Sequence, residues 1–307
     1  FFCNQLIMRS VHYFALVFSA IIVALSISVL GMSAALFDKG YTNDAHVAYG
    51  VIGSVLSIFA SSIGILIYLS APEQHASVLT KVYIGMALTS LFFLVGDAGS
   101  FALVIDNFDF GLPELMLACF GVEIVLSFFW LIILFVVYWG EILGKREKTS
   151  GEYETLTDNS TSQGGSVNIG YRELLVGMMS IFFLIIIGLA AANRDGDAGS
   201  GSFGFRVETP DTLAAFALTG AVLGFLTSMG GLLLPMLRVP AFYIRIAWLV
   251  SALVSFWFLT CAFGSWSIGW QSLENAGLGY DLFAAEMAFE IITCVAWGAL
   301  IVFYPRW

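Results

Sequence analysis

Two glutamates interrupt runs of residues that otherwise read as membrane-spanning helix. Glu123 lies in VEIVLSFFW at 122–130, and Glu290 lies in FEIITCVAW at 289–297. A tryptophan follows each glutamate at the same spacing, Trp130 in the first run and Trp297 in the second. The recurrence of an acid with a tryptophan two helical turns later indicates that both runs serve the same purpose.

Two further acids lie in similar surroundings. Asp97 lies in the apolar run LVGDAGS, and Glu286 precedes Glu290 by one helical turn on the same helix face. An unpaired ionised acid at mid-membrane costs at least ~2.5 kcal/mol on insertion scales, so it must have a partner or stay protonated. The four acids therefore form either an ion path, proton relay or ligand site, or a set of hydrogen-bonded ties between helices.

The composition predicts a membrane protein. The 307 residues are 59% hydrophobic and 11% charged, whereas soluble domains carry about 25% charged residues. Eight apolar runs are long enough to cross a bilayer, which takes roughly 20 helical residues. They cover 12–36, 47–70, 82–104, 113–140, 173–192, 211–236, 242–265 and 283–304. We therefore predict an all-α integral membrane protein with eight transmembrane helices.

The charges of the loops predict the orientation. An even number of spans places both termini on one side, and that side carries most of the Lys and Arg residues. The positive-inside rule assigns it to the cytoplasm, together with the central linker. Acidic residues dominate the opposite loops, and the net charge of −10 argues against a nucleic-acid partner. Since the chain begins FFCNQ without methionine, we expect the true N-terminus to lie upstream.

The sequence contains an internal repeat of a four-helix unit. We predict a first transmembrane unit at 1–140, a polar cytoplasmic linker at 141–171 and a second unit at 172–307, packed as two tandem four-helix bundles. The second and fourth spans align without a gap, GSVLSIFASSIGIL from Gly53 with GAVLGFLTSMGGLL from Gly220. The first spans align by Arg9 and Arg172, and the third by VYI at 82–84 with FYI at 242–244. Parallel repeats with an even number of spans differ from the inverted repeats of many transporters.

A stripe of small residues follows one face of the second span in each unit. Small faces let membrane helices approach closely, so we expect these residues to pack within each unit or against other chains. They are Gly53, Ser57, Ser61 and Gly64 in the first unit and Gly220, Gly224, Ser228 and Gly231 in the second.

Motifs for catalysis or cofactor binding are not found. The sequence contains no Walker A motif, no G-x-S-x-G and no H-E-x-x-H, so we expect neither an enzyme nor a cofactor. The three histidines have no ligands at metal-binding spacing, and the four cysteines suit no disulfide framework or metal cluster. Tyr153 and Leu156, in YETL of the polar linker, resemble a tyrosine-based sorting signal that clathrin adaptors read.

The chain resembles the MARVEL superfamily of four-span membrane proteins. RSVHYFALVFSA from Arg9 is similar to the opening of such domains, and GVEIVLSFFWLIILFVV from Gly121 to their last helix, especially in fungal members. An acid in the third span, here Asp97, is similar to the plant Casparian-strip relatives, although the second unit lacks one there. The resemblance implies tandem units that organise membrane microdomains or traffic cargo in lateral arrays, with membrane lipids including sterol as partners.

These observations leave three functional hypotheses. The first is a non-enzymatic membrane-organising or trafficking protein of the plasma membrane or secretory-pathway vesicles, acting by lateral helix and outer-loop contacts with itself or other membrane proteins. The second is a channel or proton-coupled transporter that uses the intramembrane acids. The third is an accessory subunit of a larger membrane complex.

Overall fold

The part of the chain that the computed structural model describes is entirely helical. Its eight helices are α1 (Phe2–Asp38), α2 (Asp44–Ser70), α3 (Glu73–Asn107), α4 (Glu114–Glu152), α5 (Tyr171–Arg194), α6 (Asp211–Leu233), α7 (Ala241–Asn275) and α8 (Asp281–Phe303). Side chains are described at 16–38, 48–67, 79–102, 114–138, 174–192, 214–233, 244–265 and 284–302. Helices are expected here because backbone groups in hydrocarbon must satisfy one another within the segment.

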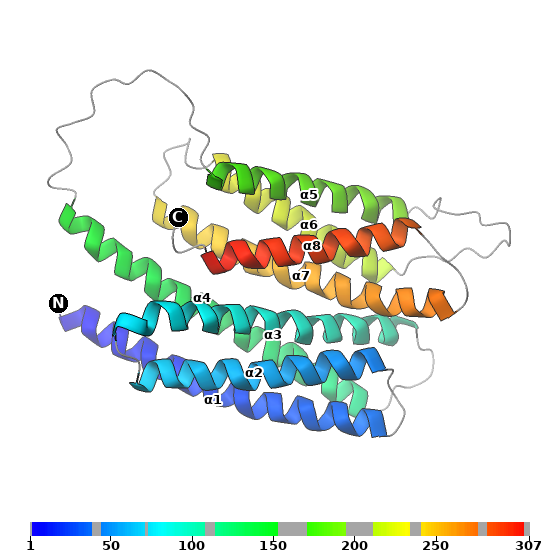
Figure 1. Ribbon diagram of the computed structural model, residues 1–307, viewed down its shortest axis with the longest axis horizontal. Coiled ribbons are helices and arrows are strands. Elements are labelled where there is room, and N and C mark those ends of the chain that lie inside the picture. Colours follow the sequence, from blue (N-terminus) through cyan, green and yellow to red (C-terminus); the bar gives the residue numbers. More distant parts are fainter. Residues whose placement is uncertain are drawn as a thin grey trace, which may run out of the picture.

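All eight described helices are long and apolar enough to span a membrane, which confirms the predicted fold class. The spans are Leu16–Asp38, Ala48–Ile67, Leu79–Ala102, Glu114–Tyr138, Leu174–Ala192, Ala214–Leu233, Ile244–Ser265 and Ala284–Val302. Each overlaps the corresponding apolar run in the sequence. Successive helices run in alternating directions, so both chain ends lie at the same end of the array (Figure 1).

Four helix boundaries extend well beyond the predicted spans, among them the start of α1 at Phe2 and the end of α7 at Asn275. The segment 71–81, predicted as a loop, is already helical from Glu73, the start of α3. The fourth helix continues past residue 140, the predicted end of the first unit, to Glu152. Hydropathy marks where a helix leaves hydrocarbon, whereas a helix ends only where its backbone hydrogen bonding ends.

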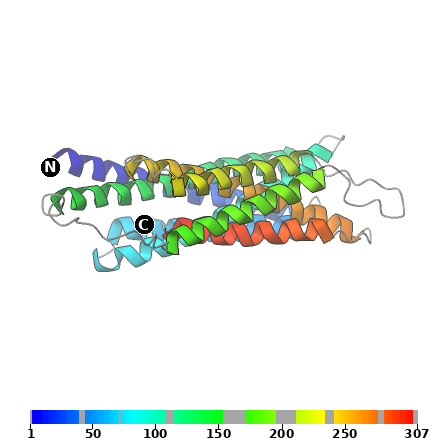
Figure 2. The ribbon, with the colours of Figure 1, turned by 90° about the horizontal axis from the view of Figure 1, so that it is seen from above.

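The helices pack in two rings of four that meet mainly along one pair, with smaller contacts of α3 with α6 and α8 and of α4 with α7. In the first ring α1 packs on α2 and α4, and α3 packs on the same two helices. In the second ring α5 and α7 each pack on α6 and α8. The rings meet where α3 packs on α7 (Figures 1 and 2). The division into two tandem bundle domains stays a prediction, and these contacts are consistent with it.

The backbones of α3 and α7 touch at a crossing formed by small residues. A Cβ atom built on Gly264 would overlap the backbone of Gly96, and one built on Gly99 would overlap that of Cys261. The Ser265 hydroxyl donates a hydrogen bond to the Gly99 carbonyl at 2.7 Å across this crossing. Because lipid supplies no hydrophobic force between helices, such close approach and its dispersion contacts hold the two rings together.

Contacts within the two rings repeat at corresponding residues. The Ser90 hydroxyl donates to the Gly53 carbonyl at 2.9 Å, and the Ser255 hydroxyl donates to the Gly220 carbonyl at 2.8 Å. These bonds join α2 to α3 and α6 to α7, and they align Ser90 with Ser255.

The same alignment holds for the leucine one turn further along the third helix of each ring. A Cβ on Gly53 would lie 3.0 Å from the Leu94 nitrogen, and one on Gly220 would lie 2.8 Å from the Leu259 nitrogen. Gly99 and Gly264 at the crossing correspond in the same register. The alignment of VYI with FYI, which needed a gap after it, is wrong, because Gly64 abuts Tyr83 and Gly231 abuts Trp248, so that Tyr83 corresponds to Trp248.

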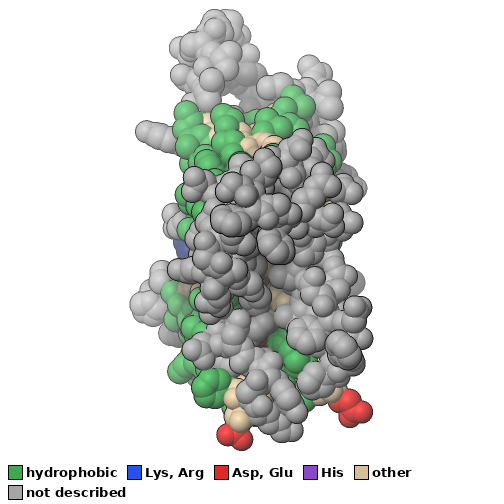
Figure 3. All heavy atoms as spheres, turned by 90° about the vertical axis from the view of Figure 1, so that its right-hand side faces the viewer, with side chains coloured by type: hydrophobic (Ala, Val, Ile, Leu, Met, Phe, Trp, Pro, Cys, Tyr) green, Lys and Arg blue, Asp and Glu red, His purple; other side chains and the backbone are tan. Residues whose placement is uncertain are grey.

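The exposed ends and sides of the array differ in character. Asp38 and Glu114, at the end of α1 and the start of α4, are exposed acids. Figure 3 looks onto this end and shows acidic side chains there, with apolar side chains along the flanks. This pattern fits a protein whose flanks face lipid and whose ends face water.

The crossing generates a test with a matched control. We expect Gly264→Ala to lower the free energy of unfolding by about 1–3 kcal/mol, because the added methyl group forces α3 and α7 apart. Gly121→Ala on α4 is the control, since its Cβ would have no atom within 4 Å. Unfolding in detergent micelles, followed by circular dichroism, compares the two. Equal stabilities would contradict the role given to the crossing.

Candidate functional site: the buried carboxyl groups

The first-ring acids meet inside the helix packing. Asp97 on α3 and Glu123 on α4 are 1% and 0% exposed, and their carboxyl groups interact with each other. The Cys119 thiol, one turn before Glu123, donates to Glu123 Oε1 at 3.6 Å. Two adjacent carboxylates repel strongly in a low-dielectric setting, so this arrangement is stable only when at least one proton is present.

All four helices of the first ring contribute to the surroundings of this acid pair. Ser33 of α1 lies with its Oγ 3.9 Å from Cys119 Sγ. A Cβ on Gly50 of α2 would lie 2.6 Å from Ser33 Oγ and 2.7 Å from Asp97 Oδ2, so glycine leaves the space that the carboxyl group occupies. Ser100 donates to the Asp97 backbone carbonyl at 2.7 Å. The pair thus lies where α1, α2, α3 and α4 converge.

Trp130 lies two turns beyond Glu123, about 10 Å along the same face of α4. Its indole Nε1 donates to Ser57 Oγ at 2.9 Å, and Ser26 Oγ of α1 lies 2.7 Å from the same oxygen. The Tyr83 ring of α3 packs on Trp130 with centroids 6.1 Å apart. The glutamate and the tryptophan therefore occupy two levels of one buried core, which explains why their spacing repeats.

The side chains that surround Trp297 in the second ring differ from those that surround Trp130 in the first. Phe183 of α5 packs edge-to-face on Trp297 with ring centroids 5.1 Å apart, and it lies against Gly224 as Ser26 lies against Ser57. Gly224, which corresponds to Ser57, leaves room for the Phe183 side chain, because a Cβ atom on residue 224 would overlap the phenyl group. Trp297 Nε1 donates instead to the Ala252 carbonyl at 3.1 Å. Ser26 thus aligns with Phe183, so the alignment of Arg9 with Arg172 is in the wrong register.

The second ring also keeps two buried acids, and one of them comes from a different position. Glu290 corresponds to Glu123, and Glu286 corresponds to Cys119. Both glutamates lie on one face of α8 and are fully buried. Ala262 of α7 stands where α3 carries Asp97. The second carboxyl group of each ring therefore comes from the third helix in one case and from the fourth in the other.

The residues around the exchanged acid change with it. Where the first ring has Ser33 and Gly50, the second has Ala190 and Ala217, both fully buried. The glycine beside Asp97 becomes alanine in the ring whose third helix carries no acid. These substitutions fill the space that the Asp97 carboxyl group occupies in the first ring. Hydropathy alone could not have revealed them.

The predicted small-residue stripe lies inside each ring. Gly53 and Gly220 abut α3 and α7 as described above, and Gly64 and Gly231 abut the aromatic rings of Tyr83 and Trp248. Ser61 and Ser228 are fully buried. The stripe thus faces the chain's own helices, which leaves other faces of α2 and α6 for lipid or partners.

Other predicted features are placed only in part. Cys119, Cys261 and Cys294 are buried free thiols. Within the described residues no cluster of three or more His, Cys, Asp or Glu side chains suits a metal ion. The sorting-signal residues Tyr153 and Leu156 lie outside the described residues, as does the Cys3 side chain.

No protein-family model, curated protein or solved structure matches the chain. Function must therefore be argued from the chain's own residues.

The exchange of acids between rings can be tested by transplantation. We expect Asp97→Ala to lower the free energy of unfolding by about 1–2 kcal/mol, because Glu123 loses its partner beside a hollow at Gly50. Adding Cys119→Glu should restore part of the loss, because Glu286 stands at that position in the second ring. Denaturant titration in micelles measures both variants. A double variant no more stable than Asp97→Ala would contradict the proposed equivalence.

Proposed function

We propose that this chain is a non-enzymatic membrane-organising or trafficking protein of the MARVEL type, acting through lateral contacts in the plasma membrane or secretory-pathway vesicles. The observation that carries the proposal is the burial of all four intramembrane acids within the helix packing. The Asp97–Glu123 pair has neighbours from every helix of its ring, as internal ties between helices would.

The alternative of an ion path makes a different demand on the acids. A path needs its carboxyl groups to line a hydrated cavity that continues across the membrane. A tie between helices requires only that the carboxyl groups be buried against neighbouring helices, and all four acids are buried.

The flanks supply surfaces for lateral contact. Along α2, Ile52, Phe59 and Leu66 are each more than two-fifths exposed and lie two turns apart. Along α5, Leu174, Met178 and Ile181 form a second exposed apolar strip. Apolar faces of this kind pack on lipid or on neighbouring membrane helices, which is the contact that a membrane organiser requires.

One observation favours the channel or proton-coupled transporter as the second candidate. Each ring retains two buried acids although their positions differ, and intramembrane acids often serve proton or ion transfer. The experiment that tests the proposal must therefore measure transport and assembly in the same preparation.

We would reconstitute the full chain in liposomes and measure proton and cation flux, together with energy transfer between donor- and acceptor-labelled copies at low protein density. We expect no flux above protein-free liposomes and energy transfer above that of randomly distributed copies. The comparison variant is Glu123→Gln with Glu290→Gln, whose folding is checked by circular dichroism. Flux in the wild type that the double variant loses would overturn the proposal in favour of transport. Absence of both flux and energy transfer would overturn self-assembly as the mode of action.

A further inference from the structure

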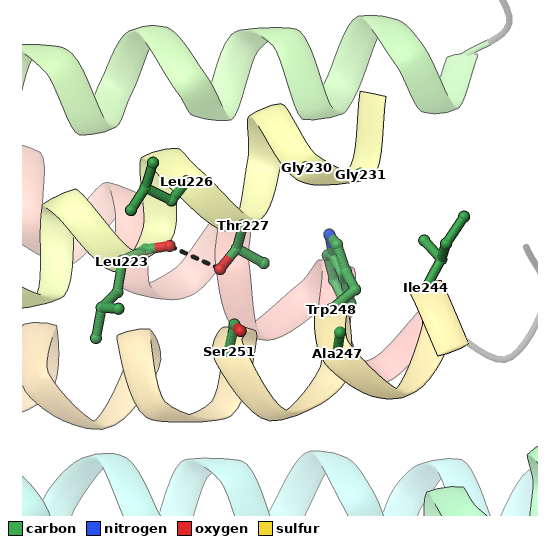
Figure 4. Close-up of a pocket in the computed structure, with 9 residues that line it drawn as sticks. All are labelled: Leu223, Leu226, Thr227, Gly230, Gly231, Ile244, Ala247, Trp248 and Ser251. Atoms are coloured by element: carbon green, nitrogen blue, oxygen red, sulfur yellow. Dashed lines mark hydrogen bonds between the residues drawn. The ribbon is translucent and has the colours of Figure 1, made fainter. Parts of the chain in front are cut away.

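A groove opens between the second and third helices of the second ring. It encloses about 230 Å³ and is lined from α6 by Leu223, Leu226, Thr227, Gly230 and Gly231 and from α7 by Ile244, Ala247, Trp248 and Ser251 (Figure 4). We call it the α6–α7 groove. None of the predicted functional residues apart from Gly231 lies in it.

Most of the lining of the α6–α7 groove is hydrocarbon, and its polar side-chain atoms are the Thr227 and Ser251 hydroxyls and the Trp248 indole nitrogen (Figure 4). The Thr227 hydroxyl donates to the Leu223 carbonyl at 2.6 Å, and its methyl group lies on the side of Trp248 (Figure 4). Trp248 itself is buried and packs on Trp297 with centroids 5.3 Å apart. A ligand of the groove would therefore be recognised by shape and apolar contact.

The groove faces the membrane near one of its surfaces. Leu226 at its rim is 59% exposed, and Ala247 is also exposed. Apart from Leu223 at the middle of the α6 span, its residues belong to the C-terminal half of that span and the N-terminal half of the α7 span. Because α6 and α7 are successive helices, these halves lie at the same end of the array, within one leaflet.

The first ring shows what such a space holds when it is filled. The contacts that align the rings place Ile63 opposite Gly230, Val82 opposite Ala247 and Met86 opposite Ser251. Ile63 and Met86 are partly buried and pack against the core. In the first ring the chain's own hydrocarbon therefore takes the space that three smaller residues leave open in the second.

We propose that the α6–α7 groove binds an acyl chain of a membrane lipid. An acyl chain is the hydrocarbon present at this depth of a bilayer, and it can supply the dispersion contacts that Ile63, Val82 and Met86 supply in the first ring. A second protein copy fits less well, because a broad helix surface cannot enter a hollow between two adjacent helices without a matching side chain. The proposal requires only that α6 and α7 face lipid, and it is independent of the membrane-organising function.

The test uses a phospholipid with a photoreactive diazirine at the middle of one acyl chain, in nanodiscs that contain the full chain. After irradiation, mass spectrometry maps the labelled residues. We expect labelling at the groove residues above that at Ile181 and Leu184 on the exposed face of α5. The variant Gly230→Ile, Ala247→Val, Ser251→Met should reduce groove labelling to the level of α5, because it installs the side chains of the first ring.

The reverse variant is the matched control. Ile63→Gly, Val82→Ala, Met86→Ser should open the corresponding space between α2 and α3 and raise labelling there. Circular dichroism and gel filtration confirm that each variant is folded. Wild-type labelling of the groove no higher than that of α5, or labelling that the filled variant retains, would overturn the proposal. Disulfide-linked dimers formed through Ala247→Cys would also overturn it and assign the groove to a second copy.

Discussion

The structure depends on one constraint: polar groups placed in hydrocarbon must find their partners within the chain. Asp97 and Glu123 satisfy it in part. Their carboxyl groups interact, the Cys119 thiol donates to Glu123 Oε1, and Gly50 leaves the space for the Asp97 carboxyl group, while Glu123 Oε2 has no hydrogen-bond partner. Each of four helices must be in place for this arrangement to close. The acids thereby select one packing of helices whose apolar surfaces would otherwise be interchangeable, since lipid tails are as apolar as the side chains.

The two rings fill corresponding places in their interiors with different residues. At the tryptophan level, Ser57 and its hydroxyl partner in one ring give way to Gly224 and the Phe183 ring in the other. At the acid level, the carboxyl group leaves the third helix, where Ala262 stands, and appears on the fourth at Glu286. Around the tryptophan and around the acids, a change in one side chain is accompanied by a change in the size or polarity of its neighbours. A densely packed interior tolerates neither an empty space nor an overlap.

Small residues decide where the rings touch and where they stay open. Gly99 and Gly264 let the α3 and α7 backbones meet, and the Ser265 hydroxyl closes a hydrogen bond across the crossing. Gly230 and Ala247 lie on outer surfaces, where small size leaves a groove. The same residue type thus produces a tight contact when a backbone faces it and a lipid-accessible hollow when the bilayer does.

Hydropathy and the cost of intramembrane charge act on each segment separately. The fold class and the eight spans could therefore be predicted from the sequence, and so could the need of the four acids for partners or protons. The register of the first and third spans became clear only from contacts between helices. These contacts align Ser26 with Phe183 and Ser90 with Ser255. Apolar side chains are nearly equivalent in a hydropathy pattern, so they cannot show which of them touch. The partnership of Asp97 with Glu123 and the crossing of α3 with α7 depend on distances between helices, which no single segment encodes.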